Sequence, residues 1–288
     1  RNLLHSIEWI DGDLMDIFSL EEGMKDCNMV IHCAAIVSFN PKHFDQMMKQ
    51  NLEGTANIVN VCLSQNIQKL GYVSSIATLG SAEENKTRTE EDYWREGKVN
   101  TQYAISKYLS EQEVWRGVEE GLDSIIVNPS VILGPGDWTK GSSQMFEKVW
   151  SGLKFYSTGS TGYVDVLDVA ECLIKLLKSD IVNERFILNS EQMKYRDIFD
   201  EIAENLNKPK PHIKVTPFLK EVAWRVEWLK SIFTNKSPLV TKETANTAMK
   251  NKSFSNQKIV TALNYTFIPI SNSIKRYSKW FLDEHTNS

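Results

Sequence analysis

The chain has 288 residues, 41% hydrophobic and 24% charged, which is ordinary for a globular protein and excludes a disordered chain. No stretch approaches the ~18 consecutive apolar residues that a membrane-spanning helix requires. The 33 basic and 37 acidic side chains nearly balance, so we expect no nucleic-acid partner and no membrane partner. The four cysteines form no CxxC pair and predict buried free thiols in a reducing, cytoplasmic compartment.

Short β-rich runs alternate with amphipathic helical stretches through the first half of the chain. In chain order we expect a strand over residues 7–10, a helix over 19–25, a strand over 29–33, a helix over 41–66, a strand over 70–74, a helix over 101–120 and a strand over 124–127. Strands separated by helices pair in parallel, and nearly continuous apolar strands have both faces covered. The predicted fold class is therefore α/β, with a doubly wound parallel sheet.

The alternation weakens after residues 134–136, where Gly, Pro and Gly break the pattern. We expect a helix over residues 141–153, an extended segment over 162–166, a helix over 168–177, a strand over 186–189 and mainly helical chain beyond residue 190. The sequence thus predicts a smaller, mainly helical second lobe.

Tyr103 and Lys107 lie four residues apart in a predicted helix, so their side chains share one face. A neighbouring ammonium favours the tyrosinate and lowers the pKa of the tyrosine toward a range useful in acid/base catalysis. A solvated helix face gives the same spacing by chance in many proteins. On spacing alone, that plainer interpretation is the more frequent one.

Small and polar residues follow several predicted strands, at the edge where open α/β sheets bind ligands. Ser74 and Ser75 end one strand, where a hydroxyl can hydrogen-bond a substrate oxygen or merely cap the loop. Residues 32–35 have small side chains that let a flat or phosphorylated ligand approach the backbone. Residues 11–14 and 128–136 follow two further strands. Each segment alone is more often a turn, but together they indicate a ligand site.

These motifs resemble the extended short-chain dehydrogenases/reductases, which include the sugar-nucleotide epimerases, over nearly the whole chain. Ser75, Tyr103 and Lys107 match that family's catalytic triad. Residues 51–55 resemble its Asn-x-x-Gly-Thr helix signature, and residues 163–170 resemble the segment that returns to the sheet. Residues 128–137 are most similar to the branch of dihydroflavonol reductases and 3β-hydroxysteroid dehydrogenases.

The resemblance implies an enzyme that uses NAD or NADP to transfer a hydride between nicotinamide and a small carbonyl or alcohol substrate. Tyr103 would be the general acid/base, Ser75 would polarise the substrate oxygen, and Lys107 would lower the pKa of Tyr103 and hold the nicotinamide ribose. The residues implied to bind the cofactor are Asp13, Leu14, Cys33, Ala34, Ala35, Asn51, Ser74, Tyr103, Lys107, Pro129 and Ser130. Residues 1–135, joined by 163–189, would form the dinucleotide-binding (Rossmann) domain, and residues 136–162 and 190–288 the substrate-binding lobe.

The family's first β-α-β unit, which carries a glycine-rich phosphate loop, has no counterpart in this sequence. In the family's strand order the absent strands are central, and a sheet without its middle exposes edges and faces. We therefore expect roughly 40–50 further residues before Arg1, enough for one strand–helix–strand unit. Those residues would include the ones that choose between NAD and NADP.

Two other functions stay open on the sequence. A nucleotide-sugar epimerase shares the same framework, whereas dehydration is disfavoured because Ile76 and Ala77 follow Ser75 where dehydratases have an Asp-Glu pair. A non-catalytic dinucleotide-binding or interaction module would account for the missing glycine loop.

The remaining expectations concern the pocket and the surfaces. The candidates to line an apolar substrate pocket are Trp94, Trp138, Met145, Phe146 and Tyr156. The helices over residues 41–66 and 101–120 either pack fully on the sheet or also form a homodimer interface. Residues 218–233, with Trp224, Trp228 and Ile232 at four-residue spacing, fit a helix on the second lobe better than a membrane-surface anchor. The scattered histidines predict no metal site.

Overall fold

The computed structural model describes residues 6–80, 86–95, 97, 100–222, 224–225 and 242–286. Its main sheet has four parallel strands in the order β1 (Met29–His32), β2 (Lys69–Val73), β4 (Ser124–Pro129) and β8 (Glu184–Leu188). β4 is buried along its whole length, and β2 is buried except at its last residue. The predicted doubly wound parallel sheet is confirmed.

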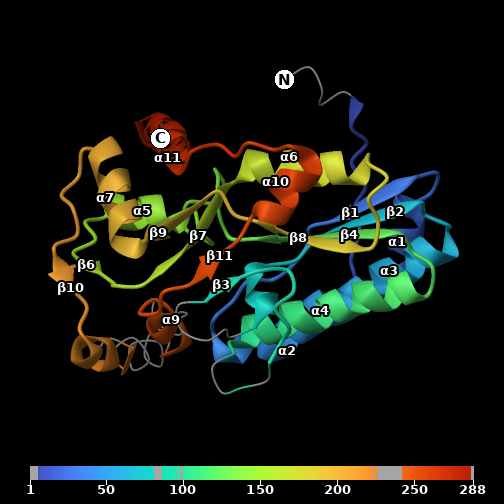
Figure 1. The fold of residues 1–288 in the computed structure, drawn as a ribbon, viewed down its shortest axis with the longest axis horizontal. Coiled ribbons are helices and arrows are strands. Elements are labelled where there is room, and N and C mark those ends of the chain that lie inside the picture. Colours follow the sequence, from blue (N-terminus) through green and yellow to red (C-terminus); the bar gives the residue numbers. More distant parts are fainter. Residues whose placement is uncertain are drawn as a thin grey trace.

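Helices cover both faces of this sheet, as Figure 1 shows. α3 (Gly54–Ser64) and α4 (Gln102–Glu119) lie on one face, where Val59 and Val114 pack against Leu70. α6 (Val166–Leu177) and α10 (Gln257–Leu263) lie on the other. A Cβ on Gly71 of β2 would come within 3.1–3.2 Å of leucine side chains of α6, so the absent side chain sets how closely that helix approaches.

The helix predicted over residues 41–66 is one nearly continuous run with an irregular turn. It passes through η2 (Pro41–His43), α2 (Phe44–Met47), η3 (Met48–Glu53) and α3. η3 is a π-helical turn, a feature that is frequent at functional sites. It contains the buried residue Asn51.

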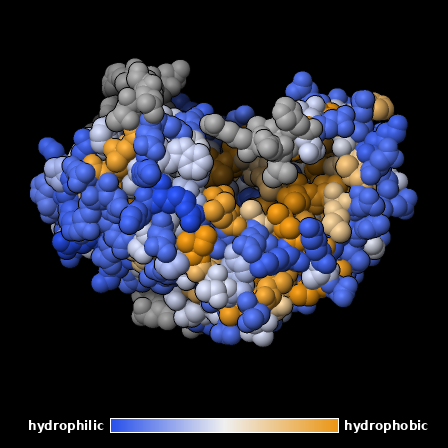
Figure 2. Space-filling view, turned by 90° about the horizontal axis from the view of Figure 1, so that it is seen from above, coloured by the Kyte–Doolittle hydropathy of each residue, from blue (hydrophilic) through white to orange (hydrophobic). Residues whose placement is uncertain are grey.

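The strand predicted over residues 7–10 is wrong. These residues have no regular structure and are exposed, with Trp9 80% accessible. A strand exists only where its backbone pairs with a neighbour, and among the described strands β1 pairs on one side alone, with β2. The β1 side chains Met29 and Ile31, which point to the same face of the sheet, are also exposed, so that face is uncovered at β1. The face seen in Figure 2 is hollowed, and hydrophobic side chains gather in that hollow.

A second sheet has the three strands β5 (Val131–Leu133), β7 (Ser160–Asp165) and β9 (Glu191–Lys194), and we call the part of the chain packed around it the second lobe. The domain bounds given above stay a prediction. β7 runs parallel to β5 and antiparallel to β9. The helices α5 (Gln144–Trp150), α7 (Tyr195–Asn205) and α11 (Ile270–Thr286) enclose a core that contains Phe146, Ile198 and Phe281. The predicted helices over 141–153 and 168–177 are confirmed as α5 and α6.

A buried carboxylate joins this lobe to the main sheet. Asp165 ends β7 and caps α6 by accepting from the Leu167 N–H at 2.9 Å. It also accepts from the Tyr277 hydroxyl at 2.6 Å and the Ser273 hydroxyl at 2.5 Å, both on α11. One side chain therefore fixes three elements.

The remaining elements are short. They are α1 (Ile17–Gly23), η4 (Ile76–Leu79), α9 (Lys242–Thr247) and the parallel pairs β3 (Thr87–Arg88) with β11 (Ser253–Phe254) and β6 (Phe155–Tyr156) with β10 (Ile213–Lys214). No helix in the described part of the chain is long and apolar enough to cross a membrane. Trp228 and Ile232 of the predicted 218–233 helix lie outside the described residues.

The cysteines are all free, as predicted, but only Cys62 and Cys172 are buried. Cys27 and Cys33 are exposed, because they follow α1 and the edge strand β1 rather than lying within the core.

Candidate active site

The N-terminal half of α4 presents one polar face to the carboxyl end of β2. Thr101 begins the helix, and its hydroxyl oxygen accepts from the Ala104 N–H at 3.1 Å. Tyr103, Lys107 and Glu111 follow at intervals of four residues, so they share a face of the helix. The predicted pairing of Tyr103 with Lys107 on one helix is thus confirmed in its geometry.

Ser75 lies beside Tyr103. Its hydroxyl oxygen accepts from the Ala77 N–H at 3.1 Å and caps η4, the short turn that follows β2. Burial raises the pKa of Tyr103, and a side-chain hydrogen bond with Ser75 acts against that rise. The Phe39 ring meets the Tyr103 ring edge-on at 5.9 Å. The structure therefore brings the predicted serine and tyrosine together.

Lys107 is buried, with 2% of its surface exposed. Its Nζ donates to the Tyr72 hydroxyl at 2.8 Å and to the Val73 carbonyl at 2.9 Å. Burial lowers the pKa of Lys107 to about 8, although the nearby Glu111 carboxylate raises it. Lys107 thus contacts Tyr72 rather than Tyr103, and its lowering of the Tyr103 pKa stays a prediction.

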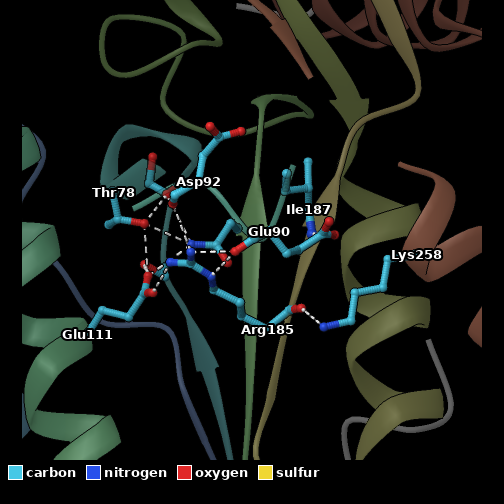
Figure 3. Close-up of polar contacts among 10 residues, drawn as sticks. Thr78, Glu90, Asp92, Glu111, Arg185, Ile187 and Lys258 are labelled. Atoms are coloured by element: carbon cyan, nitrogen blue, oxygen red, sulfur yellow. Dashed lines mark hydrogen bonds and ion pairs between the residues drawn. The ribbon is translucent and has the colours of Figure 1, made fainter. Parts of the chain in front are cut away.

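Glu111 is a buried carboxylate that the sequence analysis missed. Its Oε2 accepts from the Ser74 hydroxyl at 2.5 Å, the Thr78 hydroxyl at 2.9 Å and the Asn128 side-chain amide at 2.9 Å. Its Oε1 accepts from Arg185 at 3.2 Å, as Figure 3 shows. These bonds join α4 to β4, to β8 and to the loop after β2. The sequence pattern that could have pointed to Glu111 is its position four residues after Lys107, on the same face of the helix.

Arg185 extends this network toward the loop that follows η4. Its guanidinium donates to the backbone carbonyls of Glu90 and Asp92 (Figure 3). The Glu90 carboxylate in turn accepts from the Ile187 N–H at 2.8 Å. No local pattern points to Arg185, because 74 residues separate it from Glu111.

The Asn51 side chain forms hydrogen bonds with two separate segments of the chain. Its Oδ1 accepts from the Ile36 N–H at 2.7 Å, and its Nδ2 donates to the Ile36 carbonyl at 2.9 Å and the Ser106 hydroxyl at 3.1 Å. The side chain thereby fixes the loop after β1 to α4. Direct contact between Asn51 and a cofactor stays a prediction.

The other residues predicted to bind the cofactor follow the strand ends. Cys33, Ala34 and Ala35 are exposed beyond β1, whereas Ser74, Pro129 and Ser130 are buried at the ends of β2 and β4, where Ser130 bonds Leu188. Lys107 uses two of its three ammonium protons, and the third has no acceptor among the described residues. A buried, unfilled cation donor beside exposed small residues fits the ribose and nicotinamide end of a dinucleotide.

Asp13 and Leu14 lie in the segment before α1. Asp13 is exposed, and its carboxylate accepts from the Met15 N–H at 2.9 Å. Leu14 packs against Gly54 at the start of α3, where a Cβ would come within 3.0 Å of it. Their predicted contact with an adenine stays a prediction.

A cavity of about 550 Å³ opens next to Tyr103. Phe39, Ile76 and Ala77 line it near the tyrosine. None of the predicted lining residues Trp94, Trp138, Met145, Phe146 and Tyr156 is among those described around it. For this cavity the prediction is wrong. Trp94 stacks on Tyr108, Trp138 and Phe146 lie in the lobe core, and Met145 packs against that core.

The doubly wound sheet, with Ser75, Tyr103 and Lys107 near its carboxyl edge, is the arrangement expected of the short-chain dehydrogenase/reductase class. Residues 1–188 match the model of the NAD dependent epimerase/dehydratase family, and the chain belongs to that family.

Relatives with established names agree with this assignment. Cinnamoyl-CoA reductase 1 of Petunia hybrida is 27% identical over 203 residues, which are 67% of this chain and 60% of that enzyme. 3beta-Hydroxysteroid-dehydrogenase/decarboxylase isoform 1 of Arabidopsis thaliana is 23% identical and aligns with 94% of this chain and 66% of its own length. The chain thus spans about three fifths of the petunia reductase.

A solved structure extends the likeness to three dimensions. The crystal structure of gox2253 superposes with a TM-score of 0.80 at 30% identity, covering 95% of this chain and 84% of that one. The predicted family resemblance is confirmed.

Proposed function

We propose that the protein is an NAD(P)-dependent oxidoreductase that interconverts a carbonyl and an alcohol through Ser75, Tyr103 and Lys107. The observation that carries the proposal is the placement of Ser75 next to Tyr103 beside the cavity, with Lys107 buried one helical turn away. The names of the relatives, which are reductases and a dehydrogenase, support the same reaction type.

The bound nicotinamide supplies the hydride, and the chain's own residues handle the substrate oxygen. In the direction of reduction, Tyr103 donates its phenolic proton to the carbonyl oxygen while Ser75 hydrogen-bonds the same oxygen. The buried ammonium of Lys107 stabilises the tyrosinate that results, because charges interact strongly where water is excluded. The third ammonium proton of Lys107 is left to hold a ribose hydroxyl.

The test has two stages. Tryptophan fluorescence is titrated with NADH and with NADPH, and we expect saturable micromolar binding that is weakened in Lys107→Met. The matched control is Lys175→Met, which removes an exposed ammonium of α6 that is paired with Glu171. The absence of binding by the folded wild-type chain would contradict the proposal and favour a non-catalytic module.

The second stage measures consumption of the preferred nucleotide across a panel of aldehydes and ketones. We expect net consumption with at least one carbonyl compound. An epimerase recycles its cofactor within each turnover, so conversion of a nucleotide sugar without net consumption would replace the proposed reaction by epimerisation.

A further inference from the structure

The cavity beside Tyr103 is strongly basic. Lys86, Arg88, Lys250 and Lys252 all line it, and its described lining residues include no aspartate or glutamate. A neutral carbonyl substrate needs none of these charges. The positive charge of the cavity therefore bears on the class of substrate, which the catalytic residues alone do not specify.

The pairing of two short strands brings the cations together. β3 and β11 run in parallel with Thr87 opposite Ser253, so Lys86 and Lys252 enter the pair side by side. The backbone around Lys252 is fixed on β7, because its N–H donates to the Ser160 carbonyl at 3.0 Å. The arrangement is thus part of the fold's framework.

Two of the cations, the buried Arg88 and the half-buried Lys252, form no ion pair in the described part of the chain. Arg88 is 8% exposed and lies 5.6 Å from the Phe254 ring centroid, and no described carboxylate forms an ion pair with it or with Lys252. Lys86 differs, because it is largely exposed and pairs with Asp92 at 2.7 Å. Arg88 and Lys252, which the pairing of β3 with β11 brings together, are therefore the cations of the cavity best placed to bind an anion.

The electrostatics agree with this geometry. Burial, and then the charges of Arg88 and Lys250, lower the pKa of Lys252 to about 8. Burial also lowers the pKa of Arg88, although the Asp92 carboxylate acts against this shift. Like charges held together away from water destabilise the fold unless a bound anion compensates them. Perturbed pKa values of charged residues that line a cavity are typical of functional sites.

We propose that Arg88 and Lys252 bind an anionic group of the substrate, a phosphate or a carboxylate, while its carbonyl or hydroxyl carbon lies at Tyr103. This inference rests on the proposed oxidoreductase function and specifies its substrate class. The planar guanidinium suits both oxyanions, because it can donate two parallel hydrogen bonds. Tyr103 and the two cations line the same cavity, so one molecule can reach both.

The anion is distinct from the phosphates of the cofactor. None of Cys33, Ala34, Ala35, Pro129 and Ser130, the predicted cofactor contacts at the strand ends, is among the described residues that line this cavity. The substrate and the dinucleotide accordingly approach Tyr103 from different surroundings.

Binding is tested first without catalysis, by calorimetric titration of the full chain with inorganic phosphate and with acetate. We expect at least one anion to bind and its dissociation constant to rise about tenfold or more in Arg88→Gln and in Lys252→Gln. Lys175→Gln is the control and should bind like the wild type. Anion binding that neither variant weakens, or no binding at all, would overturn the inference. Should Arg88→Gln fail to fold, Lys252→Gln and Arg88→Lys carry the test.

Turnover then separates this inference from the proposed function. Glyceraldehyde 3-phosphate is compared with glyceraldehyde, and succinic semialdehyde with butanal. We expect an anionic aldehyde to have a kcat/KM about 10- to 100-fold above its neutral partner, with the preference lost in Arg88→Gln. Reduction of neutral and anionic aldehydes alike would overturn the inference and leave the oxidoreductase intact. Anion binding at Arg88 and Lys252 without reduction of any aldehyde would support the inference and contradict the proposed oxidoreductase function.

Discussion

The buried carboxylate of Glu111 supports both the fold and the active site, which gives a prediction with a magnitude. Glu111 is 1% exposed and accepts hydrogen bonds from Ser74, Thr78, Asn128 and Arg185. Glu111→Ala leaves these donors without their acceptor. Removing one partner of a buried ion pair costs about 3–5 kcal/mol of the free energy of unfolding.

The individual contacts place the loss within that range. Arg185 is 17% exposed and keeps its hydrogen bonds to the Glu90 and Asp92 carbonyls. The loss of its ion pair with Glu111 therefore lies at the lower end of that range, near about 3 kcal/mol. The two hydroxyl donors each lose an acceptor, at about 1 kcal/mol apiece. We expect Glu111→Ala to lower the free energy of unfolding by about 4–5 kcal/mol, a large part of the ~5–15 kcal/mol typical of a folded protein.

The assay is equilibrium urea unfolding followed by tryptophan fluorescence, with the slope against denaturant compared between variants. The matched control is Glu113→Ala, on the same helix, where the carboxylate is 27% exposed and pairs with a partly exposed Arg116 at 2.8 Å. That pair is worth less than about 1 kcal/mol. Equal losses in the two variants would refute the argument that burial of Glu111 decides its contribution.

Two further predictions concern pH and the second lobe. Burial, followed by the charge of Lys107, lowers the pKa of His32 to about 4 from 6.5. As the pH falls, the unfolded chain therefore binds a proton at His32 at a higher pH than the folded chain does. About 3 kcal/mol of the free energy of unfolding, present above pH 6.5, is lost as the pH falls to 4. His32→Gln should lack this part of the pH dependence, and an unchanged dependence would contradict it. Asp165→Ala should cost about 3–5 kcal/mol and expose α11 to proteolysis, whereas Glu171→Ala, at an exposed pair, should leave the stability nearly unchanged.

Much of the fold could be read from local patterns. The strands β1, β2, β4 and β8 are apolar runs bounded by turn residues, and the spacing of Tyr103 and Lys107 placed both on one helix face. The strand expected over residues 7–10 fails for a non-local reason. Its pattern is adequate, but no described strand pairs with it.

The parts of the site that were missed depend on distant pairings. Arg185 meets Glu111 only because β8 lies beside β4 in the sheet. Lys252 reaches Arg88 only because β11 pairs with β3. Neither partnership leaves a periodic signal, and the cavity that Arg88 and Lys252 line was accordingly expected to be apolar.

The central claim, that Tyr103 supplies the proton while a hydride moves between nicotinamide and a substrate carbon, is tested by isotope transfer. Reduction with NADH or NADPH carrying deuterium at the transferable position should place one deuterium on the product carbon per turnover. Tyr103→Phe should keep nucleotide binding and slow that transfer by about 10²- to 10⁴-fold. Product without deuterium, or transfer by Tyr103→Phe at the wild-type rate, would contradict the account.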